Sequence, residues 1–161
     1  MKCTLIVAAV LAQTTQATAM SCMAPDAVQT FQFLNADPDP YFVIHGTLDF
    51  DPDLLPPAVA DENQRNVPLI PARFTGKGLS AAGFVTDYIS DVTLQVTCAG
   101  PWCGSATSGT EVVIFVPATD PPVMVEASPC GAYIFENPTQ ATLDALTTCM
   151  QGGPCSAQPL Q

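Results

Sequence analysis

Alternation along residues 41–50, which gathers large apolar side chains on one side, predicts the clearest β-strand of this chain. The residues on the apolar side of this strand are Phe42, Ile44, Leu48 and Phe50. Shorter alternating patterns and compact β-branched runs predict further strands at 72–79, 91–98, 111–117 and 123–127. Gly76 and Gly78 interrupt the 72–79 strand and allow a bulge or a bend there. About five strands separated by turn signals indicate a mainly β domain, either a sandwich or a small barrel.

A short helix is predicted before the first of these strands, within residues 25–35. The side chains of Val28, Phe31 and Leu34 recur at helical spacing and share one face of it. The run Asp37-Pro38-Asp39-Pro40 ends this helix, because proline cannot continue it.

A second helix is predicted near the C-terminal end. Asn137 is expected to be its N-cap, with Pro138 in the first helical position and Gln140 completing a capping box. The run Gly152-Gly153-Pro154 ends this helix. The face that we expect to pack on the barrel carries Leu143, Leu146, Cys149 and Met150.

The first nineteen residues have the pattern of an export signal. A lysine supplies the positive start, residues 4–12 form an apolar run, and Ala17-Thr18-Ala19 is a small-x-small processing site. A second such site ends at Ser21, so we expect cleavage after Ala19 or after Ser21. No later run approaches the roughly 20 apolar residues that a membrane helix needs. Residues 20–161 are therefore predicted to form one exported domain, periplasmic or secreted, without a transmembrane segment.

The chain is strongly acidic, with fifteen acidic residues, four basic residues and a net charge of −11. Removal of the signal would leave three basic residues against fifteen acidic ones, which is a net charge of −12. Those three are Arg65, Arg73 and Lys77. Nucleic acids and anionic membranes are recognised by clustered basic side chains, so this composition excludes both as partners.

The number of cysteines also depends on the signal. Cys3 leaves with it, and the even number that remains is typical of an exported protein whose cysteines are all in disulfides. Proximity in the sequence favours the pairs Cys98–Cys103 and Cys149–Cys155, and it leaves Cys22 to reach Cys130. Fully paired cysteines hold no zinc, and we expect no cofactor.

One acidic run resembles a calcium-binding loop. Asp49-Phe50-Asp51-Pro52-Asp53 matches the start of an EF-hand, but Leu54 and Ala60 stand where that loop requires glycine and a bidentate glutamate. The run therefore favours a solvated acidic strand end. An irregular calcium site that also uses Asp37 or Asp39 remains open.

Ser80 is a second candidate for catalysis, as a nucleophile. Ser80 lies in Gly78-Leu79-Ser80-Ala81-Ala82, a near miss to the Gly-x-Ser-x-Gly elbow, and the one histidine, His45, precedes it in the chain. His45 falls on the polar face of the 41–50 strand, where we expect a half-exposed side chain. We therefore predict no catalytic residues.

The whole domain resembles a netrin-like module, the fold shared with the tissue inhibitors of metalloproteinases. The resemblance rests on the early Cys22, the strands at 41–48 and 92–96, and the pair Cys130-Gly131 before the last aromatic segment. It implies a five-stranded oligonucleotide/oligosaccharide-binding (OB) barrel flanked by helices, with the early cysteine bridged into the barrel. The inhibitors have a second cysteine two residues after the first, and here that position is Ala24, which argues against metalloproteinase inhibition.

These observations together predict an exported binding module without catalytic activity, whose partner is an unknown protein or small ligand. Residues 51–71 contain five prolines and no sustained period, so they are expected to form a long surface loop. That loop, or the exposed barrel face, is the expected binding surface. The alternative is a small exported hydrolase or calcium-dependent enzyme that combines the carboxylates of residues 37–53 with His45 or Ser80.

Overall fold

The structure, a computed structural model, describes residues 21–59, 69–119 and 121–157. The expected export signal lies outside the described residues, as do Arg65 and the middle of the proline-rich loop. Within the described ranges, no helix is both long enough and apolar enough to cross a membrane.

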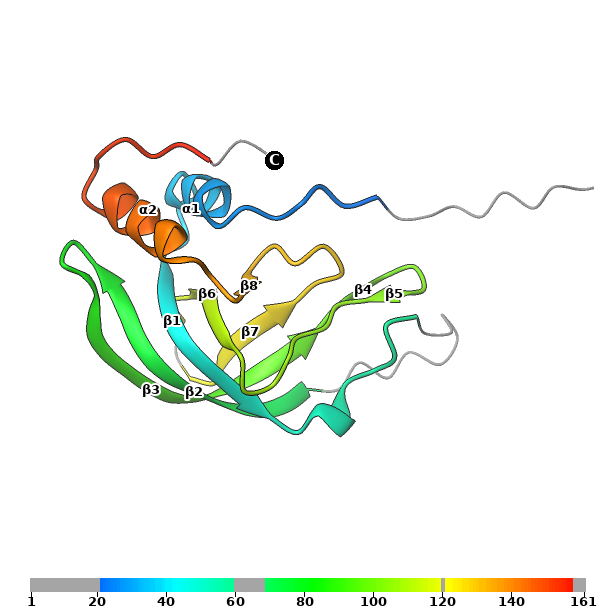
Figure 1. Cartoon of the computed structure of the whole chain (residues 1–161). Helices are drawn as coiled ribbons and strands as arrows, with labels where there is room; N and C mark the ends of the chain where they lie inside the picture. Colours follow the sequence, from blue (N-terminus) through cyan, green and yellow to red (C-terminus); the bar gives the residue numbers. More distant parts are fainter. Residues whose placement is uncertain (1–20, 60–68, 120, 158–161) are drawn as a thin grey trace, which may run out of the picture.

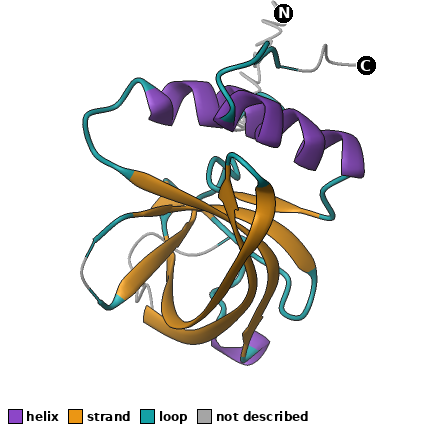
Figure 2. Ribbon diagram, turned by 90° about the vertical axis from the view of Figure 1, so that its left-hand side faces the viewer, coloured by secondary structure: helices purple, strands orange, loops and turns teal. Residues whose placement is uncertain are grey.

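Six strands form one sheet that curls into a half-barrel (Figures 1 and 2). They are β1 (Tyr41–Phe50), β2 (Leu69–Ser80), β3 (Gly83–Val96), β6 (Glu111–Pro117), β7 (Val123–Ala127) and β8 (Ile134–Glu136). Their spatial order is β7-β3-β2-β1-β6-β8, and every neighbouring pair is antiparallel except β3 with β7. Because β6 returns beside β1 after the meander β1-β2-β3, the arrangement is a Greek key. The long return contains a separate hairpin, β4 (Cys98–Ala99) with β5 (Trp102–Cys103).

Two strands are longer than the apolar pattern predicts. β2 begins at Leu69 rather than at residue 72, and β3 begins at Gly83 rather than at residue 91. The added residues are held by main-chain pairing between β2 and β3, which does not require an apolar face. The expected irregularity among the glycines of β2 is confirmed, because the register shifts between Gly78 and Leu79.

The inner core fills the hollow side of the curled sheet. Ile44 and Leu48 point into it from β1 and are at most 1% exposed. Phe42, which the alternation assigns to the same apolar side, is 54% exposed. That expectation was wrong because the core begins at Ile44 on this strand and does not extend to Phe42. Burial of each large aliphatic side chain contributes about 1.5–3 kcal/mol to folding.

A second core lies on the outer face of the sheet, under two helices (Figure 2). The helices are α1 (Ala27–Asn35) and α2 (Gln140–Met150). Val43, Val113 and Phe115 of β1 and β6 are buried against them. The outer face of β1, which alternation predicts to be polar and exposed, is therefore apolar and covered over its first half.

Each helix begins at a side-chain cap. The side chain of Asp26 accepts a hydrogen bond from Gln29 N at the start of α1. Thr139 caps α2 and accepts from Thr142 N, so the expected cap at Asn137 and its capping box were wrong. Asn137 N instead donates to Glu111 O, which keeps Asn137 in register with the sheet and outside the helix.

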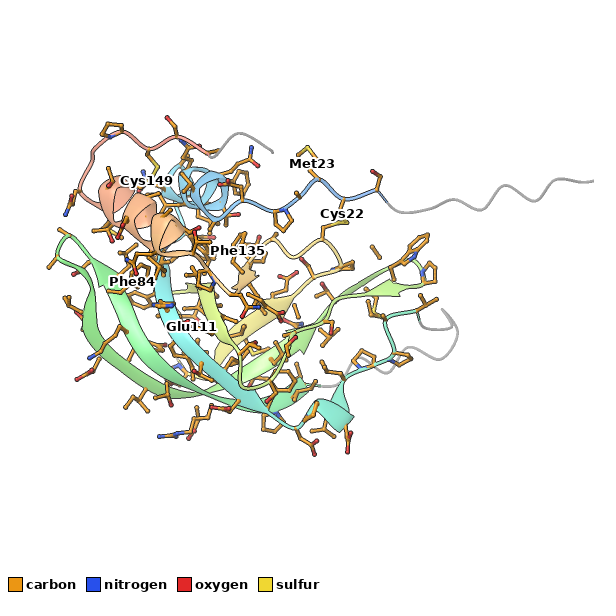
Figure 3. All side chains as sticks on the ribbon, viewed as in Figure 1. Cys22, Met23, Phe84, Glu111, Phe135 and Cys149 are labelled. Carbon is orange, nitrogen blue, oxygen red and sulfur yellow. A yellow bond between two sulfur atoms is a disulfide. The ribbon has the colours of Figure 1, made fainter. Side chains whose placement is uncertain are left out.

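Three disulfides are present: the two pairs that sequence proximity favours, Cys98–Cys103 and Cys149–Cys155, and the remaining pair, Cys22–Cys130. Cys22–Cys130 ties the segment before α1 to the loop between β7 and β8 (Figure 3). Cys98–Cys103 closes the β4–β5 hairpin, and Cys149–Cys155 ties the end of the described chain to the last turn of α2.

Candidate functional site

The residues considered for catalysis lie in different parts of the fold and have structural partners. Ser80 lies at the turn between β2 and β3, where its hydroxyl donates to Gly83 O and accepts from Ala82 N. Asp51 caps the short 3-10 helix η1 (Pro52–Leu54), because its side chain accepts a hydrogen bond from Asp53 N.

The carboxylates of residues 37–53 are spread along the fold. Asp37 and Asp39 precede β1, whereas Asp49 lies near its far end, so the length of the strand separates them. Within the described ranges, no group of three or more histidine, cysteine, aspartate or glutamate residues is placed to hold a metal ion.

His45 is half-buried on the outer face of β1, with 17% of its side chain exposed. Its Nε2 lies 2.9 Å from Glu111 Oε1, but the two are not aligned as a hydrogen bond. Its ring packs edge-on against Phe84, with the ring centroids 5.4 Å apart. His45 therefore takes part in packing between the sheet strands. Its neighbours Glu111 and Phe84 were not among the site residues considered from the sequence.

One hollow, about 670 Å³, is a shallow depression on the outer face of β2 and β3. Arg73 lies in it opposite Asp49 on one side and Asp91 on the other, and it forms an ion pair with Asp91 at 2.6 Å. Because Arg73 is already paired with Asp91 and the hollow is open, it offers little to select a ligand.

Two smaller hollows adjoin each other at the start of β1. One, of about 240 Å³, lies between the last turns of the two helices and the sheet, and the other, of about 140 Å³, lies between β6 and β7. Tyr41 and Phe115 line both hollows, so the two are adjacent, and we call them together the Tyr41 groove. Its other aromatic, sulfur and acidic side chains are Phe31, Asp37, Asp39, Met124, Glu126, Tyr133 and Met150.

The Tyr41 groove is negatively charged. Three carboxylates line it, and the hydrogen bonds to two of them come from uncharged groups. Asp37 accepts from the backbone N of Asp39, and Glu126 accepts from the hydroxyl of Thr97. No described lysine or arginine lines it. The two that the structure describes are on β2, each in an ion pair with an aspartate of β3.

The phenol of Tyr41 responds to this environment. Burial raises the pKa of Tyr41 above its ordinary value, and charge repulsion from the Tyr133 phenolate and from the carboxylates of Asp37, Asp39 and Glu126 raises it further. Both causes disfavour a negative charge on the phenolate. The field in the groove is therefore one that attracts cations.

This raised pKa predicts how stability changes in alkali. The folded state holds the Tyr41 proton more tightly than the unfolded chain does. The contribution of this proton to the free energy of unfolding is therefore complete below pH 10.0, and it is lost as the pH rises through the folded pKa. Denaturant titrations at increasing pH should therefore show a smaller alkaline loss of stability for Tyr41→Phe than for the wild type. The difference in phenolate absorbance between the two proteins should have its midpoint above pH 10.0. A midpoint at or below that value would contradict the partly buried, acidic setting of Tyr41.

The groove was not identified as a site from the sequence. Asp37 and Asp39 were among the candidates, but Tyr41, Glu126 and Tyr133 were not, since they come from distant segments that only the curled sheet brings together. Comparison of this chain with models of known protein families, with characterised proteins and with solved structures finds no match.

Proposed function

We propose that this protein is an exported, non-catalytic binding module on a netrin-like barrel of the OB type, and that it binds its ligand in the Tyr41 groove. Export is supported by the signal pattern of residues 1–19 and by the three disulfides, which form and persist in oxidising compartments.

The strand arrangement supports the choice of barrel. An OB barrel is a five-stranded, partly open Greek-key barrel. Here β1, β2 and β3 form the meander, β6 lies beside β1, and β7 lies beside β3, while β8 is a three-residue addition to β6. Among the described strands, β7 and β8 at the two ends of the sheet are not paired with each other.

The groove itself is the observation that carries the proposal. Binding surfaces combine an apolar floor with a few placed polar groups, and the groove has Phe115 and two methionines beside three carboxylates. Tyr41 and Tyr133 add rings with one polar end, a side-chain type enriched at interfaces.

Selection of peptides from a displayed random library tests this function, with the intact disulfide-bonded protein as the target. The groove variant is Met124→Ser/Met150→Ser, which removes one methionine from each hollow. The control is Val85→Ser/Ile89→Ser, since these two apolar side chains are 56% and 60% exposed on β3, away from the groove. We expect the selected peptides to lose about tenfold in affinity, or about 1.4 kcal/mol, on the groove variant and to bind the control as they bind the wild type.

Two results would count against the proposal. Peptides that bind the groove variant and the wild type equally would place the binding surface elsewhere. A library that yields no binder to the wild type would argue against a module that recognises protein segments. Thermal melting of each variant establishes that a loss of binding is not a loss of folding.

A further inference from the structure

The charge of the Tyr41 groove restricts the ligand that it can take, if the proposed function holds. Asp37, Asp39 and Glu126 line it, and no described cation neutralises them there. An anionic ligand would add to this repulsion, and a neutral one would leave it unrelieved. A cationic ligand gains from these carboxylates and from the net charge of −11, which speeds its encounter with the protein.

The size of the hollows restricts the ligand further. At about 240 and 140 Å³, each is smaller than a typical small-molecule pocket of roughly 300–1,000 Å³. Each suits a single side chain rather than a whole molecule. Two such hollows in a row, joined at Tyr41 and Phe115, match an extended peptide that inserts alternate side chains.

The side chains around the hollows favour arginine over lysine. A guanidinium stacks on aromatic rings and donates to a carboxylate in a bidentate manner, whereas an ammonium is a compact, strongly hydrated charge. Each hollow combines both kinds of partner: Tyr41 with Asp37 and Asp39 in one, and Tyr133 with Glu126 in the other.

We infer that the Tyr41 groove binds an extended, arginine-containing segment of a partner protein, with one arginine side chain in each hollow. The inference rests on the proposed function and adds the class of ligand to it. The partner is recognised by two guanidinium groups on one side of an extended chain, two residues apart.

The test is fluorescence anisotropy with short capped peptides that contain two arginines separated by one alanine. Matched peptides replace both arginines by lysine, by citrulline, which is the uncharged analogue of arginine, or by glutamate. The groove variant is Asp39→Asn/Glu126→Gln, which removes two negative charges. It keeps a side-chain oxygen at residue 126 that can accept the hydrogen bond from the Thr97 hydroxyl. The control is Asp53→Asn/Asp144→Asn, which removes the same net charge from two exposed residues that do not line the groove.

We expect the arginine peptide to bind best, the lysine peptide several-fold less tightly, and the citrulline and glutamate peptides not at all. The groove variant should lose about tenfold in affinity or more, and the control less than about twofold, because charges beyond the Debye length of about 8 Å are screened at physiological salt. Equal losses in the two variants would reduce the effect to general attraction by an acidic surface and overturn the inference.

Other outcomes separate this inference from the proposed function. Equal binding of the citrulline peptide, still weakened by Met124→Ser/Met150→Ser, would overturn the arginine ligand and keep the groove as a binding surface. Free arginine amide that binds as tightly as the peptide would overturn the partner segment in favour of a small cation. If no arginine peptide binds while uncharged library peptides do so through the groove, the inference fails and the proposed function stands.

Discussion

Replacement of Gly46 by alanine is expected to lower the free energy of unfolding by about 3 kcal/mol, at the upper end of what overpacking costs. A Cβ atom at Gly46 would lie 2.2 Å from Thr75 O and 2.5 Å from Gly76 Cα. These are backbone atoms of β2, which cannot rotate away as a side chain could. Gly46 and Gly76 are direct cross-strand partners, so the two glycines let β1 and β2 approach closely where the sheet curls.

Denaturant unfolding of three alanine variants measures this effect. Gly76→Ala should be destabilised as strongly as Gly46→Ala, since its Cβ would lie 2.2 Å from His45 O. Gly78→Ala is the control in the same strand, because its Cβ would meet nothing closer than Thr86 O at 3.9 Å. Similar stability of all three variants would contradict the close approach of β1 and β2.

Removal of the disulfide between Cys22 and Cys130 is expected to produce the other large loss. The two cysteines are 108 residues apart, and closure of so long a loop in the unfolded chain corresponds to about 4.7 kcal/mol in the chain-entropy model. Cys149 and Cys155 are only 6 residues apart, for which the same model gives about 2 kcal/mol. The double serine variant at 22 and 130 should therefore lose about twice as much as the double variant at 149 and 155.

The same substitution should also affect the groove. Cys22 anchors the segment that leads into α1. Phe31 and Leu34 of α1 line the larger of the two hollows of the Tyr41 groove. Thr30 gives one further tie, since its hydroxyl donates to Ala132 O at 3.2 Å. We expect weaker peptide binding by the Cys22→Ser/Cys130→Ser variant under conditions in which it is still folded. Equal midpoints of the two double variants in denaturant would show that loop length does not govern their stability.

Much of the sheet could be predicted because alternation reports which side of a strand is buried. Leu48 alternates with the polar Thr47 and Asp49, and both Leu48 and Ile44, four residues before it on the same side of the strand, point into the inner core. The Val112 to Val116 run of β6 has no alternation because it is buried on both faces, inside the curl and under the helices. The three residues of β8 are too few for any period to be visible.

The candidate site could not be predicted in the same way. Asp37 and Asp39 stood out as an acidic run, but nothing near Tyr133 or Glu126 in the sequence marks either as a partner of Tyr41. Their proximity depends on how far the sheet curls and on how the helices dock, which are properties of long-range packing.

Local patterns in the sequence alone determined the mainly β character, the helix at each end, the acidity and the two short-range disulfides, Cys98–Cys103 and Cys149–Cys155. Each of these depends on residues that are close in the chain or on a count of residue types. Only the tertiary structure decided which face of β1 the helices cover, that Thr139 rather than Asn137 starts α2, and that Tyr41 joins two hollows. These features arise where segments distant in the chain compete for the same contacts, and the order of residues does not show which contact prevails.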